Sequence, residues 1–325
     1  MFRRFLILPV LISLQSLSYA TESDNEAYKW MERMHQAVQQ LNYEGTFVHL
    51  HNQHMASLKI VHTVENGVEK ERLVSLNGAR REVVRSKGEV VCIQPDIKSV
   101  LVGKRYGHEG IANILPYNPD EISAYYDFRI VGQERIADRN SKIILVVPKD
   151  ENRYGHRVSL DMESALPLRS DLLDNTGKPI SQIMFTSMKI GPTVKDNSLE
   201  LVTHDELKDY EWKRQNPAQN MTDSNNESKW VFGSVPDGFR LSVHESREGA
   251  NSNHPVEHFV FTDGFATMSV YIEKAVAEKM FEGESQMGAI HAYGTQSNGF
   301  QITAVGEVPA QTVKTFALSA KYKQE

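Results

Sequence analysis

The sequence predicts an exported α+β protein with two domains, each built mainly from antiparallel strands. Three patterns lead to this fold class. A helical pattern near the N-terminus precedes many short alternating strands, a polar segment interrupts them at residues 215–229, and a second group of strands ends in a C-terminal helix. With 325 residues, of which 40% are hydrophobic, the chain is long enough for more than one core.

The first twenty residues have the pattern of a secretory signal peptide. Arg3 and Arg4 form a positive start, an apolar stretch covers residues 5–17, and Ser-Tyr-Ala at residues 18–20 supplies the small residues that signal peptidase requires. The apolar stretch is shorter than the about 20 residues that a membrane-spanning helix needs. A membrane anchor or a buried helix would be the alternatives. We therefore predict that residues 1–20 are a signal peptide and that the protein leaves the cytosol.

The first domain should combine one helix with a curved sheet. Residues 25–41 predict an amphipathic helix, because apolar side chains recur at three- and four-residue steps. Asn66-Gly67 between two alternating runs is a strong hairpin signal. The strands that we expect cover residues 43–51, 57–65, 68–76, 80–86, 89–94, 96–102, 128–136, 142–148, 157–161, 167–173 and 180–189. A helix lying in the concavity of such a sheet makes a half-open barrel with an apolar cleft, which suits a hydrophobic ligand.

The second domain follows a polar segment. Residues 215–229 are rich in Asn, Ser, Gln and Asp and contain almost no core-forming side chains, which predicts a flexible linker. After it we expect a compact α+β domain with strands at 239–246, 256–262, 266–273, 288–295 and 299–305 and a helix at 309–321. The predicted division is therefore a signal peptide at 1–20, an N-terminal domain at 21–214, the linker at 215–229 and a C-terminal domain at 230–325.

Composition and motifs argue against several classes of function. The net charge of -6 disfavours non-specific nucleic-acid binding, which depends on excess positive charge. The sequence contains neither a Gly-rich phosphate loop nor a G-x-S-x-G nucleophile elbow. The single cysteine, Cys92, lies in an apolar run and is best interpreted as a buried strand residue, with a redox role as the alternative. We therefore expect a binding protein without a cofactor, and not an enzyme.

Histidine spacing provides the one metal signal in the sequence. His49 and His51 would share a face of a strand and His54 would follow from the turn, so the three could ligate one ion. No Cys or carboxylate at ligand spacing completes the set. We favour the interpretation that these residues form a solvated strand end, and we predict no metal.

A cluster of arginines is the candidate binding site. Arg80, Arg81 and Arg85 fall within one expected strand of a chain with net negative charge. Guanidinium groups bind phosphates and carboxylates through a planar fork, so an anionic head group or an acidic peptide is the expected partner. The alternative is a surface strand whose charges pair with Glu82 and Glu89.

Four segments also share their residues and order with a known family. They are residues 43–48 (YEGTFV), 76–83 (LNGxRREV), 91–96 (VCxxPD) and 261–273 (FTDGFAxMSVYIE). On these residues the chain resembles the MucB/RseB family of periplasmic sigma-E regulators. The likeness covers nearly all of the chain after residue 20, with a polar linker where the family has one.

The resemblance implies a specific architecture and role. It implies an N-terminal domain similar to the LolA/LolB lipoprotein carriers and a smaller C-terminal domain that helps to hold the periplasmic part of a transmembrane anti-sigma factor. Binding in that family protects the anti-sigma factor from regulated proteolysis, and a lipid or lipopolysaccharide signal releases it. The expected location is the periplasm, and the sequence leaves homo-oligomer formation open.

Two other functions compete with the regulator. A periplasmic lipid or lipoprotein carrier without a regulatory role would use the same curved sheet, although such a carrier needs no second domain. A periplasmic hydrolase or metal enzyme would use His49, His51 and His54. The absence of local catalytic motifs makes the last of these the weakest.

Overall fold

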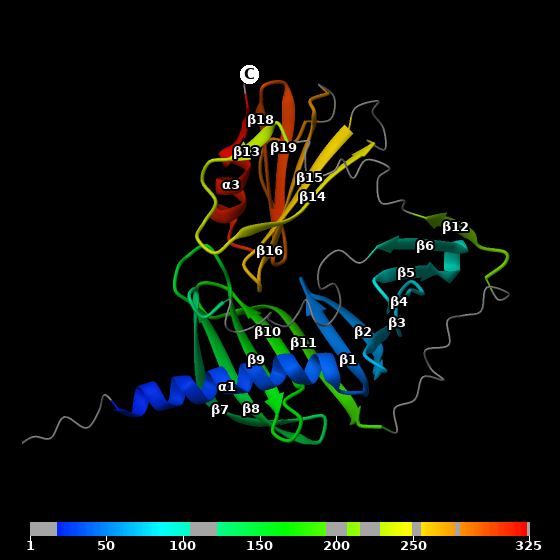
Figure 1. Ribbon diagram of the computed structural model, residues 1–325, viewed down its shortest axis with the longest axis vertical. Coiled ribbons are helices and arrows are strands. Elements are labelled where there is room, and N and C mark those ends of the chain that lie inside the picture. Colours follow the sequence, from blue (N-terminus) through cyan, green and yellow to red (C-terminus); the bar gives the residue numbers. More distant parts are fainter. Residues whose placement is uncertain are drawn as a thin grey trace, which may run out of the picture.

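The computed structural model describes residues 18–104, 122–192, 207–214, 228–248, 255–276 and 280–323. A large curved sheet with a helix on its concave side lies below a smaller sheet in Figure 1. The two sheets have separate hydrophobic cores, one around the first helix and one around the last. The fold class that the sequence predicts, a half-open barrel wrapped on a helix plus a smaller α+β domain, is therefore confirmed.

The first part of the chain forms helix α1 and a sheet of twelve strands. The elements are α1 (Ser18–Gln40), β1 (Tyr43–His51), β2 (His54–Glu65), β3 (Val68–Ser75), β4 (Glu82–Ser86), β5 (Glu89–Gln94), the 3₁₀ turn η1 (Pro95–Ile97), β6 (Ser99–Lys104), β7 (Tyr126–Ile136), β8 (Arg139–Pro148), β9 (Gly155–Asp161), β10 (Pro167–Leu173), β11 (Pro179–Ile190) and β12 (Glu211–Arg214). Their order in the sheet is β12-β6-β5-β4-β3-β2-β1-β11-β10-β9-β8-β7. The sheet stays open, with β12 and β7 as its two edges.

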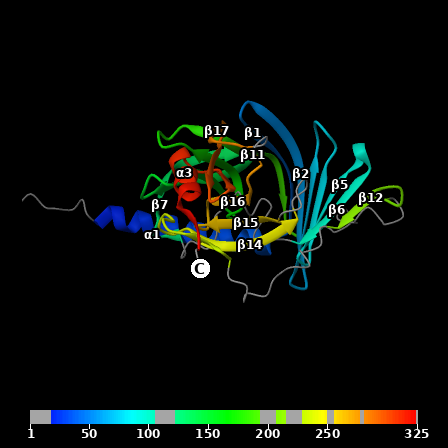
Figure 2. The same ribbon diagram turned by 90° about the horizontal axis from the view of Figure 1, so that it is seen from above.

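Helix α1 fills the concave side of the sheet (Figures 1 and 2). Its apolar face is the one that the three- and four-residue spacing predicts, and Met31 and Met34 on it are fully buried. The helix packs against β7 and β2. Gly45 allows the sheet to close tightly here, because a Cβ atom at this position would lie 2.7 Å from the carbonyl oxygen of Ser187 and 2.8 Å from the ring of Phe185.

The smaller sheet belongs to the second part of the chain. Its elements are β13 (Trp230–Phe232), β14 (Arg240–Glu248), β15 (Pro255–Thr262), β16 (Thr267–Lys274), β17 (Gly283–Met287), β18 (Ile290–Ser297), β19 (Phe300–Gly306), α3 (Ala310–Ser319) and β20 (Ala320–Tyr322). Six strands pair in the order β14-β15-β16-β19-β18-β17, and β13 pairs separately with β20. The buried face of α3, which includes Val313 and Phe316, completes this core.

Several predicted elements differ from the structure or lie beyond it. Strand β4 begins at Glu82 and not at residue 80, and residues 95–97 form η1 before β6 starts. Residues 1–17 of the predicted signal peptide and residues 215–227 of the predicted linker lie outside the described residues. Among the residues that are described, no helix has the length and apolar character needed to cross a membrane.

Candidate functional site

An ion pair without solvent exposure joins the two sheets. Arg153, in the loop between β8 and β9, places Nη1 2.8 Å from Oδ2 of Asp263, in the turn between β15 and β16. Both side chains are 0% exposed. The hydroxyl of Tyr126 on β7 donates to the same carboxylate oxygen at 2.9 Å. Residues 110 positions apart in the sequence therefore meet in a dry contact between the two domains.

Each partner of this pair is held in place by its own domain. The other carboxylate oxygen of Asp263 accepts hydrogen bonds from the backbone N–H groups of Phe265 (2.8 Å) and Ala266 (2.7 Å), which fixes the turn. The Arg153 guanidinium donates to Asp150 of its own loop and to the carbonyl oxygen of Asp237 in the second domain.

Aromatic rings surround the same guanidinium. The Cζ atom of Arg153 lies 5.0 Å from the ring centroid of Tyr125, 5.6 Å from that of Tyr126 and 5.1 Å from that of Phe239. These are cation–π distances, and the rings exclude water from the ion pair. Burial and the charge of Asp263 raise the pKa of Tyr126 well above its ordinary value, so its hydroxyl remains a donor. We call Arg153, Asp263 and Tyr126 the junction cluster.

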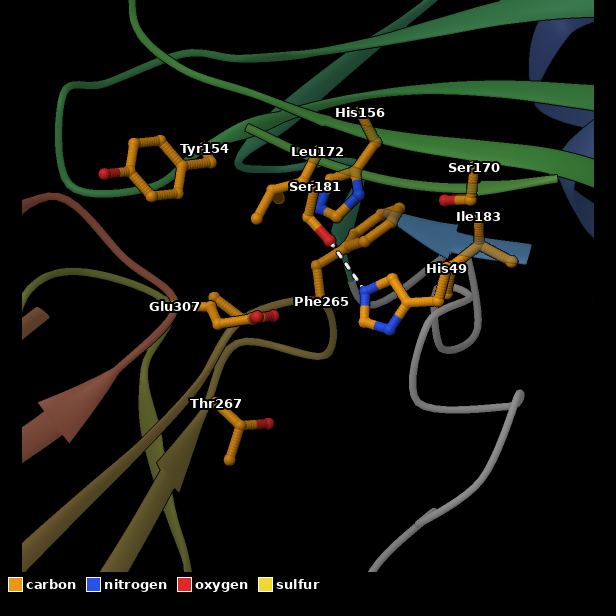
Figure 3. Close-up of a pocket in the computed structure, with 11 residues that line it drawn as sticks. His49, Tyr154, His156, Ser170, Leu172, Ser181, Ile183, Phe265, Thr267 and Glu307 are labelled. Atoms are coloured by element: carbon orange, nitrogen blue, oxygen red, sulfur yellow. Dashed lines mark hydrogen bonds between the residues drawn. The ribbon is translucent and has the colours of Figure 1, made fainter. Parts of the chain in front are cut away.

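A pocket of about 290 Å³ lies between the two domains (Figure 3). Phe265, which lines it, packs against Tyr126 of the junction cluster. It is lined by His49, Tyr154, His156, Ser170, Leu172, Ser181, Ile183, Phe265, Ala266, Thr267 and Glu307. The first domain supplies residues of β1, β9, β10 and β11 and the residue before β9. The second domain supplies the β15–β16 turn, the first residue of β16 and the residue after β19. A ligand in this pocket would therefore contact both domains.

Apolar and polar side chains both line the pocket, and its described lining residues include no Lys or Arg. Burial lowers the pKa of His49, with a smaller contribution from His51, and burial lowers the pKa of His156 to about 4. Burial raises the pKa of Glu307, against the opposing effect of His51. Without a fixed cation, the pocket suits an apolar group that carries neutral hydrogen-bonding atoms better than it suits a phosphate.

One contact in the pocket resembles the Ser–His pair of a catalytic triad. Nε2 of His49 lies 3.0 Å from Oγ of Ser181, as the dashed line in Figure 3 marks. A nucleophilic serine also needs a third group that orients the histidine. Within the described part of the chain, no carboxylate hydrogen-bonds to the other ring nitrogen of His49. The described residues therefore do not complete a triad around His49 and Ser181.

The histidines of the metal hypothesis do not converge. His49 faces the pocket and Ser181, whereas His54 is exposed on β2. The rings of His49 and His51 lie 5.9 Å apart, measured between their centroids. Among the described residues, no group of three or more His, Cys, Asp or Glu side chains could hold a metal ion.

The structure separates the three candidate arginines. Arg80 and Arg81 lie in the exposed loop before β4, so the single strand expected to carry all three is a wrong prediction. Arg85 lies on β4 and is paired with the buried carboxylate of Glu71. Burial raises the pKa of Glu71, and Arg85 opposes this shift. Within the described residues, no carboxylate pairs with the side chains of Arg80 and Arg81, whereas Arg85 is paired with Glu71.

The junction cluster is the part of the site that the sequence analysis misses. Asp263-Gly264 is a hairpin signal between two expected strands, and it lies within the segment that resembles the family. A useful signal was present, since an Asp followed by Gly in a hairpin commonly caps its own turn. Nothing in the sequence indicated that Arg153 was the partner of this carboxylate.

Acid should weaken the contact between the domains through His156. Its ring stacks on Phe265 of the second domain at 4.7 Å between centroids. The folded pKa of about 4 lies below the ordinary value of 6.5, so the unfolded chain binds the proton more tightly. The stability is therefore complete above pH 6.5 and is lost as the pH falls toward 4. Because the ring is partly exposed, we expect the free energy of unfolding to fall by about 1–2 kcal/mol between pH 7 and 5.

Urea unfolding at the two pH values, on the wild type and on His156→Asn, measures this effect. The variant lacks the titrating ring, so its loss of stability on acidification should be smaller than that of the wild type by about 1–2 kcal/mol. Carboxylates that titrate in the same range affect the wild type and the variant equally, so the difference between the two losses of unfolding free energy belongs to His156. Equal losses in the two proteins would contradict the assignment.

Comparison with known proteins places the chain in a family. The model of the MucB/RseB N-terminal domain matches residues 26–203, and that of the MucB/RseB C-terminal domain matches residues 224–321. The sigma factor AlgU regulatory protein MucB of Pseudomonas aeruginosa is 30% identical over 97% of this chain and 96% of its own length. The sigma-E factor regulatory protein RseB of Salmonella typhimurium is 30% identical over 90% of each chain.

A solved structure resembles both domains together. The complex of Pseudomonas aeruginosa MucA and MucB superposes with a TM-score of 0.74 at 29% identity, covering 92% of this chain and 100% of the matched chain. The two family models and the curated relatives thus agree with the structure over almost the whole sequence. The chain belongs to the MucB/RseB family.

Proposed function

We propose that this protein is a periplasmic negative regulator of the sigma-E envelope stress response. It binds the periplasmic part of a transmembrane anti-sigma factor, shields it from regulated proteolysis and releases it on sensing lipid or lipopolysaccharide. The observation that carries the proposal is the match of both domains to the MucB/RseB family, whose relatives are named as regulators of sigma factors. The likeness to MucB in complex with MucA supports the choice of partner.

The junction cluster supports a binding surface made by both domains. The buried pair of Arg153 and Asp263 holds the two sheets in one arrangement, so side chains from both can face one partner. Such a protein needs no catalytic step. The proposal also gives a role to the second domain, which a simple carrier does not require.

A row of apolar side chains supports the lipid ligand. Leu73, Val83, Cys92 and Leu101 are successive cross-strand neighbours on β3, β4, β5 and β6. All four side chains are partly exposed. Leu73 also packs against the core around α1, so the row continues the concave face of the sheet. An acyl chain lying along this row would bury apolar surface that water now contacts.

Binding of the lipid and binding of the anti-sigma factor are thermodynamically linked. If a lipid binds the free protein better than the complex, then it must lower the affinity for the anti-sigma factor by the same factor. The competing function is a lipid carrier without a regulatory role, which the apolar row alone would also allow. The carrier predicts bound acyl chains in the purified protein and no effect on the proteolysis of any anti-sigma factor.

The test mixes the protein with the recombinant periplasmic domain of the anti-sigma factor from the same cell. We expect a stable complex on size-exclusion chromatography and by titration calorimetry at micromolar concentrations. Added lipid A should weaken it, whereas a non-acylated sugar phosphate should leave it unchanged. Absence of a complex at these concentrations would contradict the proposal, and lipid binding without a complex would favour the carrier.

A further inference from the structure

Three loops of the large sheet lie together at one end of its strands. They are the β1–β2 turn, the β3–β4 loop and the connection from β5 to β6. The side chain of Asn77 accepts from the N–H of Ser57 at 2.6 Å and donates to the carbonyl oxygen of Met55 at 2.9 Å. The backbone N–H of Arg80 donates to Oδ2 of Asp96 at 2.9 Å. These bonds hold the three loops as one surface.

A large apolar side chain is exposed in the β3–β4 loop, another in the β5–β6 connection and a third at the start of β2, just after the β1–β2 turn. Met55 is 62% exposed, Leu76 is 52% exposed and Ile97 is 69% exposed. One exposed apolar residue is ordinary on a protein surface, but three on hydrogen-bonded neighbouring loops form a patch.

Three exposed cations lie among these apolar residues. Arg80, Arg81 and Lys98 are exposed, and in the described part of the chain no carboxylate pairs with their side chains. The contrast with the neighbouring strands is clear, because Arg72 pairs with Glu82. Asp96 is the acidic group of this surface, and one of its oxygens accepts the backbone N–H of Arg80. A local excess of positive charge in a chain of net charge -6 requires an explanation.

The patch reaches the second domain. A Cβ atom at Gly288, in the β17–β18 turn, would lie 2.7 Å from Nε2 of His51 and 2.9 Å from Cβ of Asn52. The exposed side chain of Met287 precedes this glycine. An extended partner on the loops could therefore continue onto the second domain. We call the surface made by Met55, Leu76, Arg80, Arg81, Ile97 and Lys98 the apolar–basic rim.

We propose that the apolar–basic rim docks an acidic amphipathic peptide segment of the anti-sigma factor, an inference that rests on the proposed function. Carboxylates of the segment would pair with the forked guanidinium groups of Arg80 and Arg81. Its apolar side chains would cover Met55, Leu76 and Ile97. The charge of the rim selects the partner, and the apolar side chains supply buried area.

A peptide fits the rim better than an anionic bilayer does. Stable attachment to a membrane takes a long apolar anchor or a polybasic cluster of several residues. The rim has three short apolar contacts and three cations, one carboxylate lies among them, and the whole chain is negatively charged. These features favour short-range, directional pairing with carboxylates over attraction to a charged surface.

The test compares charge reversals at the rim with charge reversals at exposed positions elsewhere in the first domain. Arg80→Glu/Arg81→Glu changes the rim, and Lys87→Glu/Arg129→Glu makes the same change in charge on exposed residues elsewhere in the sheet. Affinity for the recombinant periplasmic domain of the anti-sigma factor is measured at two salt concentrations. We expect the rim variant to bind at least tenfold more weakly, with a slower association rate and a smaller dependence on salt. Equal affinities of the two variants would overturn the inference.

A second pair of variants tests the apolar contacts. Leu76→Ser/Ile97→Ser should weaken binding, whereas Leu241→Ser, at an exposed position on β14, should not. Vesicles of phosphatidylethanolamine and phosphatidylglycerol provide the alternative ligand. If the rim variants lose binding to vesicles and keep the anti-sigma factor, then the rim is a membrane surface and the inference is wrong. If the wild type itself binds no anti-sigma factor, then the proposed function fails first.

Discussion

Replacing Asp263 with Asn is expected to lower the free energy of unfolding by about 3–5 kcal/mol. Asn has nearly the same shape, and its carbonyl oxygen can still accept from the backbone of Phe265 and Ala266. What disappears is the negative charge beside Arg153, whose guanidinium is 0% exposed. An unpaired charge in a dry contact is costly, because the low-dielectric surroundings do not replace its hydration.

Urea unfolding followed by circular dichroism and by tryptophan fluorescence measures the effect of Asp263→Asn. The control is Asp138→Asn, which removes the exposed ion pair of Arg135 and Asp138 and should change stability by no more than about 0.5 kcal/mol. The double variant Arg153→Met/Asp263→Asn should be less destabilised than the sum of the two single variants. A stability of Asp263→Asn within the range of the control would refute the role of the junction cluster.

The same variants connect stability with binding. If both domains contact the anti-sigma factor, then Asp263→Asn should weaken the complex even under conditions where each domain remains folded. Small-angle scattering on this variant should show a larger and more variable separation of the domains than in the wild type. The distance between the rim and the second domain would then no longer match an extended partner.

Local turn chemistry explains which parts of the fold the sequence could predict. Asn66 and Gly67 have φ angles of 51° and 76°, the positive values that these residues tolerate in a hairpin turn. Strands β1, β5 and β10 have the bounds that alternation and turn residues predict. The buried stripe of α1 follows directly from the spacing of its apolar side chains.

Pairing between distant segments explains what the sequence could not predict. The helical pattern continues to residue 321, but Ala320–Tyr322 leaves the helix to pair with Trp230–Phe232. Strand β12 is exposed along its whole length and is a strand because it pairs in parallel with β6. Residues 211–214 have no hydrophobic period, and residues 320–321 continue a helical period instead of a strand alternation. Both segments become strands through pairing with β6 and β13, which their own residues do not indicate.

The candidate site also contains residues that the sequence could predict and residues that depend on contacts between distant segments. Arg80 and Arg81 could be selected from the sequence because a cationic pair is unusual in an acidic chain. That Arg85 would be neutralised could not be predicted, because Glu71 reaches it across the register of β3 and β4. The junction cluster forms only where the two domains contact each other. The sequence around Arg153 therefore gives no indication that its side chain pairs with Asp263.

Met34→Ala is the second change with a large expected effect, and it tests how firmly α1 is held in the sheet. Met34 is 1% exposed within the core of the first domain. Truncation removes apolar contacts and leaves a cavity, so we expect the free energy of unfolding to fall by about 2–5 kcal/mol. Urea unfolding measures it against Gln36→Ala, an exposed position on the same helix that should change stability by less than about 0.5 kcal/mol.

The stability of Met34→Ala also indicates where a lipid would bind in the first domain. A large loss of unfolding free energy would mean that α1 is an integral part of the core. An acyl chain would then have to bind beyond the helix, along Leu73, Val83, Cys92 and Leu101. If Met34→Ala costs no more than Gln36→Ala, then our description of α1 as the centre of the core is wrong. The helix would then act as a cover that a lipid could displace, and lipid A should bind Met34→Ala more tightly than the wild type because the competing contact is weaker.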